Sequence, residues 1–350
     1  MERNPNGDYA VPGSPGDGIS SLSWSPDGRF LAATSWDSSV RCYEVGVQQQ
    51  IYGVERAQTS CEGPVLCSAF SKDGLSVFAA GCDFQARQWH LETQQTIVFG
   101  RHEKPIKEIF CVDNLILTGS WDQTIKCWDL RSPVAAATLS LPERCYAMDA
   151  VYPLLVVGTA ERKILTFDLS RANWQQPLRF EESPLRHQTR CVAAFPNREG
   201  FAIGSIEGRV AVHHVDPKDV GRNFAFKCHR DTKSGQPTIV DVYSVNAIAF
   251  HKQFSTFATA GADGVYNFWD KDAKQRLMAE THGLQARRQL HSLCAILAHR
   301  QSIRLGPFLR LVTRIRKLQP PDTQPHHASP PRRRRNQAPE IIQNKVVGFF

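Results

Sequence analysis

The sequence predicts an all-β fold, a β-propeller built from repeated four-stranded blades. The main observation is a motif that recurs six times, in which an acidic residue is followed six positions later by an aromatic residue or a histidine. The pairs are Asp37/Tyr43, Asp83/Trp89, Asp122/Trp128, Glu161/Phe167, Glu207/His213 and Asp263/Trp269. Successive acidic positions lie 46, 39, 39, 46 and 56 residues apart, close to the period of about 40–45 residues that propeller blades have.

The pattern within each repeat indicates strands joined by tight turns. Residues 19–37 contain a first apolar run, the turn sequence SPDG, a second apolar run and the turn sequence SWD. Ser, Pro, Asp and Gly favour tight turns, and apolar runs of this length are typical of strands. We expect the turn acid and the aromatic marker to hold neighbouring strands in register, because a turn Asp needs donors and a buried indole N–H needs an acceptor.

Composition and charge separate the repeats from the C-terminal part. The 350 residues are 41% hydrophobic and 22% charged, as in a globular protein with a full-sized core. The formal net charge is +8, but residues 278–350 hold 11 Arg and 2 Lys against 3 Asp or Glu, so the repeats themselves are slightly acidic. In that tail Arg332 to Arg335 form a candidate nuclear import signal, because an extended arginine run can bind an acidic receptor groove.

The end of the repeat pattern at Arg276 sets the expected domain limits. We expect a flexible arm over residues 1–16 and the propeller over 17–276. A basic segment with helical leucine spacing follows over 277–319, and a Pro/Arg-rich disordered tail over 320–350.

Several classes of protein are disfavoured by the sequence. It contains no run of about 18 apolar residues and no readable secretory signal, which indicates a cytosolic or nuclear protein without membrane insertion. The cysteines form no CxxC pair. Cys228-His229 and His213-His214 each lack the second pair that a tetrahedral zinc site needs, so we expect neither a metal nor a cofactor.

The repeats resemble the WD-repeat family, most clearly in SWDSSVRCYEV at 35–45 and SWDQTIKCWDL at 120–130. In that family His102, Ser120, Asp122 and Trp128 would form a hydrogen-bond network inside the blade. The same His, Ser and Asp could be a catalytic triad, but other repeats have the acid without the His, which favours the structural interpretation. Most propellers of the family have seven blades. The seventh is therefore missing or replaced here, and the flanks of the first and last blades would be uncovered.

Six loop sequences that the fold does not require narrow the resemblance. They are LPERCYAMD at 141–149, ESPLRHQTRCVAAF at 182–195, GSIEGRVAVHH at 204–214, FKCHRD at 226–231, YSVNAIAFH at 243–251 and FWDKDAKQRL at 268–277. Together they are similar to the RNA-export WD-repeat factors of the nuclear pore, over about residues 8–277. Related mitotic-checkpoint propellers share the architecture and some of these motifs, whereas residues 278–350 do not resemble the family.

The resemblance implies a non-catalytic scaffold of nuclear mRNA export, found in the nucleus, at the pore complex of the nuclear envelope and in the cytoplasm, with a further role at the mitotic spindle or checkpoint. It implies that the scaffold docks a nucleoporin carrying a GLEBS motif and contacts single-stranded RNA. For the peptide the candidates are Trp36, Trp121 and Arg209, because turns between second and third strands open on one face and such side chains anchor peptides. An exposed turn Trp covers neighbouring backbone about as often as it binds, so both interpretations of the two tryptophans stay open.

For RNA, the candidates combine an aromatic platform with cations, as single-strand binding requires. They are Phe226, Lys227, Arg230, Trp269, Lys271, Lys274 and Arg276. The alternative is that Trp269 is the core marker of its blade and that the lysines form a solvated turn. Because the repeats are slightly acidic, RNA binding there would be local and salt-sensitive.

A competing function is that of a substrate receptor of a cullin ubiquitin ligase. Trp128, Asp129 and Arg131 in WDLR at 128–131 resemble the box by which some WD-repeat proteins dock onto the ligase adaptor. Enzymatic activity is a third class, and it would need convergent carboxylates, histidines or metal ligands in the funnel. Because the acidic markers are committed to turns, we expect no catalytic residue.

Overall fold

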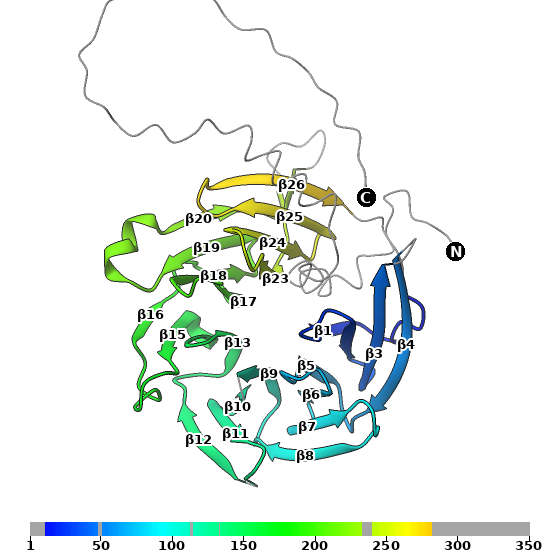
Figure 1. The fold of residues 1–350 in the computed structure, drawn as a ribbon. Helices are drawn as coiled ribbons and strands as arrows, with labels where there is room; N and C mark the ends of the chain where they lie inside the picture. Colours follow the sequence, from blue (N-terminus) through cyan, green and yellow to red (C-terminus); the bar gives the residue numbers. More distant parts are fainter. Residues whose placement is uncertain (1–10, 48–50, 113–114, 133, 233–239, 282–350) are drawn as a thin grey trace, which may run out of the picture. The chain divides into compact units, whose positions relative to one another are not determined.

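The computed structural model describes residues 11–47, 51–112, 115–132, 134–232 and 240–281. These residues belong to one compact unit and form six antiparallel four-stranded sheets, the blades of an all-β propeller (Figure 1). The predicted fold class is confirmed. The segment expected over 320–350, the import signal within it and most of the segment expected over 277–319 lie outside the described residues.

Each blade uses four consecutive strands, apart from a hairpin inserted between the last two blades. Blades 1 and 2 consist of β1 (Ile19–Trp24), β2 (Phe30–Ser35), β3 (Ser39–Val47), β4 (Ile51–Ser60), β5 (Val65–Phe70), β6 (Ser76–Gly81), β7 (Gln85–His90) and β8 (Thr96–Arg101). Blades 3 and 4 consist of β9 (Ile106–Val112), β10 (Leu115–Ser120), β11 (Thr124–Asp129), β12 (Ala135–Ser140), β13 (Cys145–Val151), β14 (Leu154–Thr159), β15 (Lys163–Asp168) and β16 (Arg179–Glu182). Blades 5 and 6 consist of β17 (Thr189–Ala194), β18 (Gly200–Ser205), β19 (Arg209–His214), β20 (Phe224–Lys227), β23 (Val245–Phe250), β24 (Thr256–Gly261), β25 (Val265–Asp270) and β26 (Gln275–Thr281). The remaining elements are the hairpin β21 (Arg230–Thr232) and β22 (Val240–Val242), and the short 3-10 helices η1 (Ala160–Arg162) and η2 (Pro217–Arg222).

The turn between β1 and β2 forms where the sequence predicts it. The Ser25 N–H donates to the Phe30 carbonyl at 2.8 Å, and the Ser25 hydroxyl donates to Asp27 Oδ1 at 2.5 Å. Gly28 has φ +73°, a left-handed conformation that favours glycine. These contacts all lie within six residues, so the local sequence is enough to specify the turn.

The turn aspartates accept hydrogen bonds from the residue two positions further on, as predicted, whereas Glu161 and Glu207 have no such bond among the described residues. Asp37 Oδ1 accepts from the Ser39 N–H at 2.9 Å and from the Ser39 hydroxyl at 2.5 Å, while its Oδ2 accepts from the Gly16 N–H at 2.8 Å. Asp122 Oδ1 accepts in the same way from the N–H and hydroxyl of Thr124, at 3.0 and 2.6 Å. Each acid thereby fixes the start of the third strand of its blade.

The core lies between consecutive blades. Trp89 of blade 2 packs against Ala32 and Val40 of blade 1, and Trp128 of blade 3 packs against Phe78 of blade 2. The aromatic marker therefore faces the preceding blade. Each such ring contributes a large buried apolar area, which makes these contacts a main source of cohesion between blades.

The first strands of successive blades contact one another in the order β1, β5, β9, β13, β17, β23. Among the described strands, no equally extensive contact joins β23 back to β1. Four large side chains on the two outer flanks are nevertheless buried. Tyr43 and Leu31 on blade 1 are 4% and 6% exposed, and Tyr266 and Phe268 on blade 6 are 6% and 7% exposed. These four side chains are thus covered, although uncovered flanks are expected of a propeller that lacks its seventh blade.

Candidate functional site

One face of the propeller carries the turns between second and third strands, because antiparallel strands place these turns at the same end of every blade. Trp36 in the β2–β3 turn is 50% exposed, and Ile206 in the β18–β19 turn is 42% exposed. Trp121 in the β10–β11 turn is half-buried. The exposure of Trp36 favours the binding interpretation for this residue, whereas Trp121 is partly covered by its surroundings.

Phe84 is an aromatic residue on this face that sequence reasoning did not single out. It lies in the β6–β7 turn with φ +67° and is 39% exposed. Gly208 and Gly264 occupy the corresponding turn positions of blades 5 and 6, with φ +62° and +81°. A bulky residue in the left-handed region is strained, and strain of this kind gathers at functional sites. The sequence signal for Phe84 is the turn GCDFQ at 81–85. It has Phe at the position where the turn GADGV at 261–265 has Gly264.

Arg209, the third predicted peptide residue, lies at the start of β19 in a charged cluster. Its Nε is 2.7 Å from Glu207 Oε1, and His187 Nε2 is 3.0 Å from Glu207 Oε2. Arg230 donates from Nη2 to the Glu207 carbonyl at 2.8 Å. Lys227 on β20 pairs in register with Arg209. We call these five residues the blade 5 charge cluster, and it joins a predicted peptide residue to two predicted RNA residues.

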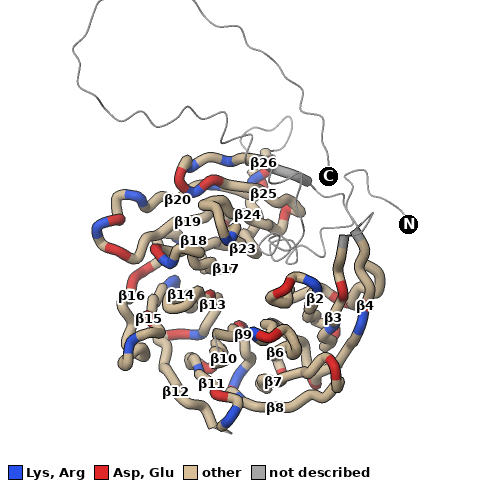
Figure 2. Tube along the Cα trace, viewed as in Figure 1, with Lys and Arg blue, Asp and Glu red and all other residues tan. Residues whose placement is uncertain are grey.

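Charge elsewhere on the propeller is mixed in sign. Figure 2 shows Lys and Arg interspersed with Asp and Glu along the described trace. Many of these charges are paired locally, as are Arg29 with Glu44 at 2.8 Å and Arg179 with Glu181 at 2.7 Å. Recognition of an anion therefore depends on particular clusters of cations rather than on a general positive field.

The aromatic part of the predicted RNA site belongs to the contact between blades 5 and 6. The rings of Phe226 and Trp269 are 4.3 Å apart at their centroids, and both pack on the buried cluster that contains Phe257. The Trp269 indole donates to Thr259 Oγ1 at 3.0 Å. Trp269 is thus the core marker of blade 6, which is the alternative that the sequence left open.

The cations of the predicted RNA site differ in their accessibility. Lys271 is 5% exposed, its Nζ lies 2.6 Å from Asp272 Oδ1, and it sits 5.0 Å from the centroid of the Phe195 ring. Lys274 is exposed and lies 5.0 Å from the centroid of Phe224. Arg276 on β26 is also exposed. The structure thus presents Lys274 and Arg276 to solvent and uses Lys271 inside the fold.

Two hydrogen-bonded tetrads stabilise blades 3 and 6. In blade 3, His102 Nδ1 lies 2.8 Å from Asp122 Oδ2, and His102 Nε2 lies 2.7 Å from Thr118 Oγ1, which also accepts from the Trp128 indole at 2.8 Å. The hydroxyl of the network is therefore that of Thr118. Ser120 had been expected there, but its hydroxyl donates instead to backbone carbonyls.

The blade 6 tetrad corrects a second expectation. His229 Nδ1 lies 3.0 Å from the Asp263 carboxylate, and its Nε2 lies 2.9 Å from Thr259 Oγ1, the acceptor of Trp269. Blade 6 therefore has a His as well as the acid, and the expectation that the other repeats lack the His is wrong for this blade. The His was missed because the hairpin β21–β22 lengthens the connection, which moves His229 away from its expected spacing.

The residues of the proposed ligase-adaptor box differ in how far they are buried. Trp128 is 5% exposed and belongs to the blade 3 tetrad. Arg131 is exposed, and its Nη2 lies 2.5 Å from Asp129 Oδ2. Hydrogen bonds from Arg131 lower the pKa of Asp129 to about 2, so this pair is ionised at neutral pH.

The described part of the chain contains no group of three or more His, Cys, Asp or Glu residues placed to hold a metal ion. The described cysteines are free thiols, and burial raises the pKa of Cys42 and of Cys191 to about 12. The reactive thiolate form is therefore disfavoured at both positions. Over the same residues, no helix is long and apolar enough to cross a membrane.

Comparison with known proteins places the chain among WD-repeat proteins. The family described as "WD domain, G-beta repeat" matches residues 9–44 and 93–129. The chain is 45% identical over 275 residues to the Poly(A)+ RNA export protein of Schizosaccharomyces pombe, covering 77% of this chain and 76% of the relative. It is 49% identical over 280 residues to Protein RAE1 of Arabidopsis thaliana, covering 79% and 78%. The chain belongs to the mRNA export factor family. It is also 46% identical over 288 residues to the mRNA export factor of Xenopus tropicalis, covering 78% and 77%.

WD-repeat propellers, the mRNA export factor family included, are typically non-catalytic scaffolds. The His–Asp pairs of this chain, which could be taken for catalytic residues, have structural contacts. His102 and Asp122 are held in a tetrad that ends on the buried Trp128, and His229 and Asp263 form the same arrangement in blade 6. The polar groups that could resemble an acid–base pair thus hold strands together.

Proposed function

We propose that this protein is a non-catalytic scaffold of nuclear mRNA export that docks the GLEBS motif of a nucleoporin and contacts single-stranded RNA. The observation that carries the proposal is the blade 5 charge cluster, in which Arg209 and Arg230 contact Glu207 and Lys227 pairs in register with Arg209. Relatives at 44–46% identity include proteins named as a Poly(A)+ RNA export protein and as mRNA export factors, which supports this role. A scaffold of this kind would act in the nucleus, at the nuclear pore complex and in the cytoplasm.

The peptide would lie across the face that carries the turns between second and third strands. Trp36 and Phe84 offer exposed aromatic rings over blades 1 and 2, and Arg209 offers a guanidinium over blade 5. Aromatic and arginine side chains supply most of the binding energy at protein interfaces. An acidic peptide with apolar anchors would therefore match both ends of this surface.

The test of the peptide contact is calorimetric titration of the full chain with a synthetic acidic GLEBS peptide. Arg209→Glu should weaken binding by about 1.5–3 kcal/mol, because it replaces a charge-assisted contact by repulsion. Arg198→Glu is the matched control, since Arg198 is exposed in the turn between β17 and β18, at the opposite end of the same blade. Equal affinity of both variants and the wild type would remove Arg209 from the site.

The RNA contact would use the exposed cations beside the junction of blades 5 and 6. Lys274→Glu combined with Arg276→Glu should reduce the steepness of log affinity against log salt by about 1.4, because each of the two lost phosphate contacts on a single strand contributes about 0.7. The nucleoporin peptide should bind this variant normally. Unchanged RNA affinity of the double variant at low salt would reject the contact. Lys271 is buried, so its substitution would test folding rather than RNA binding.

A further inference from the structure

The segment that precedes β1, residues 11–18, is held against blade 1 by its backbone. The Gly13 carbonyl accepts from Arg41 Nη1 and from the Tyr43 hydroxyl, both at 2.8 Å. Gly13 has φ +74°, and a Cβ atom there would collide with Glu55 Oε2, so this carboxylate lies directly against the glycine. Because Tyr43 is the buried marker ring of blade 1, segment 11–18 is part of what covers the outer flank of that blade.

A second anchor joins segment 11–18 to the face on which the peptide is proposed to dock. The Gly16 N–H donates to Asp37 Oδ2 at 2.8 Å. Asp37 directly follows Trp36, whose own N–H donates to the Gly18 carbonyl at 3.0 Å. The segment therefore ends beside Trp36, the exposed aromatic residue of blade 1.

Ser14 lies between these two anchors and is exposed. Its hydroxyl donates to the Val11 carbonyl at 3.3 Å, a contact within the same segment. Ser14 is followed by Pro15, and Ser-Pro is the dipeptide that proline-directed kinases recognise. Ser25 and Ser183 also precede a proline, but they are 0% and 4% exposed. Of the Ser-Pro pairs that lie wholly within the described residues, the one at Ser14 is therefore accessible to an enzyme.

The charges around segment 11–18 are mainly negative. Arg41 is the cation that holds the segment, and its side chain is only 16% exposed. Its Nη1 lies 3.3 Å from Glu55 Oε2, and its Nη2 lies 3.9 Å from Asp37 Oδ2. Asp17 adds a third carboxylate within the segment itself. A phosphate on Ser14 would thus enter a place where the guanidinium is already engaged and the carboxylates outnumber it.

We propose that Ser14 is a phosphorylation site for a proline-directed kinase and that the phosphate releases segment 11–18 from blade 1. The kinase would join Ser14 Oγ to the γ-phosphorus of ATP and break the bond between that phosphorus and ADP, while the hydroxyl proton passes to solvent. Phosphoserine carries a charge of about −1.5 to −2 at pH 7, and beside carboxylates it disrupts contacts by repulsion. The new charge beside Trp36 would also weaken docking of an acidic peptide, a consequence that rests on the proposed function.

The first experiment tests the site. The full chain is incubated with ATP and a purified mitogen-activated protein kinase, and the phosphorylated positions are located by mass spectrometry. Phosphate should appear on Ser14, and Ser14→Ala should carry one phosphate fewer than the wild type. Equal phosphorylation of the two proteins would overturn the assignment.

The second experiment tests release, using full chains that carry phosphoserine placed genetically at one position. With phosphoserine at position 14, amides of segment 11–18 should exchange hydrogen for deuterium at least about fivefold faster, because the contacts that protect them open. Phosphoserine at position 170 is the control, since Ser170 is exposed in the β15–β16 turn of blade 4, at the other end of the blades. Glu55→Gln should restore slow exchange in the position 14 protein, because it removes one of the repelling carboxylates. Unchanged or slower exchange at 11–18 would mean that Arg41 accommodates the phosphate, and release would be wrong.

Calorimetric titration with the GLEBS peptide separates this inference from the proposed function. Phosphoserine at position 14 should lower the affinity about three- to tenfold, because like charges are brought together, and phosphoserine at position 170 should leave it within about twofold. Equal affinities of the two phosphorylated proteins would overturn the effect on docking. If the unmodified chain does not bind the peptide, the proposed function fails, and the exchange experiment still decides whether the phosphate releases the segment.

Discussion

His229 Nδ1 lies 3.0 Å from the Asp263 carboxylate, although 34 residues separate them in the chain. His229 lies two residues after the end of β20, the last strand of blade 5, and Asp263 lies in the β24–β25 turn of blade 6. The contact therefore fixes the segment that leaves blade 5 onto the next blade. Arg230 is the next residue, and this placement brings its guanidinium to the Glu207 carbonyl in the blade 5 charge cluster.

His229→Ala should lower the free energy of unfolding by about 2–4 kcal/mol. The His229 side chain is fully buried, and its loss leaves Asp263 and Thr259 without their shared partner, which is the costly way to remove a buried hydrogen bond. Urea unfolding followed by far-ultraviolet circular dichroism measures the change. His187→Ala is the control, because the His187 side chain is 55% exposed and should contribute less than about 0.5 kcal/mol. Similar losses in the two variants would contradict the role of the tetrad.

Phe84→Gly should stabilise the propeller and weaken the peptide. Glycine adopts φ +67° without strain, so relief of the left-handed conformation should add about 1 kcal/mol to the free energy of unfolding. Loss of the exposed ring should lower peptide affinity at least several-fold if Phe84 anchors the ligand. Gln123→Gly offers the comparison, because Gln123 has the same φ in the corresponding turn of blade 3. It should gain stability and keep its affinity; an equal loss of affinity in both variants would point to backbone flexibility instead.

Asp149 should give the protein a pH-dependent stability. Its Oδ2 accepts from the Ala194 N–H of the next blade at 2.7 Å, and its Oδ1 accepts from the Ala150 N–H at 2.8 Å. Burial raises the pKa of Asp149 to about 6, while the two hydrogen bonds oppose the shift and Glu108 adds to it. Because the native pKa exceeds the unfolded value, the native state binds the proton more tightly. This contribution to stability is complete below about pH 4 and is lost as the pH rises through 6.

Asp149→Asn should remove this dependence, since the amide oxygen can still accept from Ala194 and carries no charge to desolvate. The stability of the variant relative to the wild type should therefore rise by about 1–3 kcal/mol between pH 4.5 and pH 7, at about 1.4 kcal/mol for each unit of pKa shift. Urea unfolding at the two pH values measures the difference. A constant difference would mean that Asp149 titrates normally.

Two buried threonines, one with a hydrogen-bonded hydroxyl and one without, should respond differently to substitution by valine. Thr118 is fully buried, and its hydroxyl bonds to both His102 and Trp128, so Thr118→Val should cost about 2–3 kcal/mol. Thr166 is 2% exposed, and its hydroxyl has no hydrogen-bond partner in the described part of the chain. Thr166→Val should be neutral or stabilise by about 1 kcal/mol, because it removes an unsatisfied polar group. Thermal midpoints of the two variants on either side of the wild type would agree with this assignment, and shifts in the same direction would not.

The sequence by itself determined the number of recognisable blades, most of their turns and the aspartates that hold four of those turns. These features depend on contacts between near neighbours, such as Ser25 with Asp27 and Asp37 with Ser39, whose spacing is visible in one repeat. It also placed Trp36, Trp121 and Arg209 on the face that carries the turns between second and third strands, because this follows from the order of strands within a blade.

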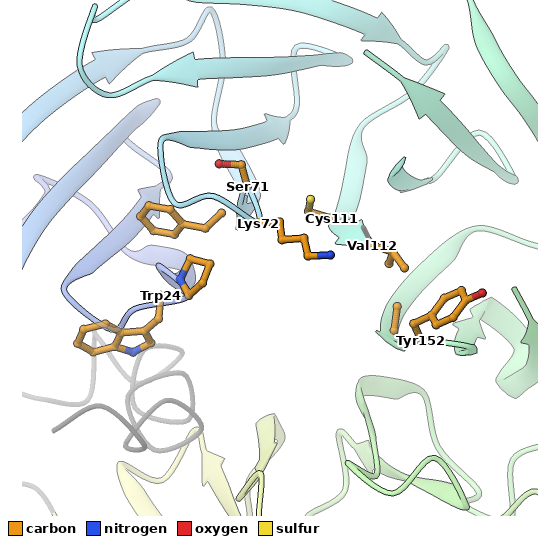
Figure 3. A pocket seen from close by; sticks show the side chains of 9 residues that line it. Trp24, Ser71, Lys72, Cys111, Val112 and Tyr152 are labelled. Carbon is orange, nitrogen blue, oxygen red and sulfur yellow. The ribbon is translucent and has the colours of Figure 1, made fainter. Parts of the chain in front are cut away.

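Only the tertiary structure decided which of those residues are available and what they contact. Lys271 is buried against Phe195, and Trp269 packs on Phe226. His229 contacts Asp263 although the hairpin β21–β22 lies between them in the chain. A hollow lined by Trp24, Phe70, Cys111 and Tyr152, among others, is made by strand ends and turns from four blades (Figure 3). The physical reason is that burial and charge pairing depend on how whole sheets pack side by side, and residues brought together in this way have no fixed spacing in the sequence.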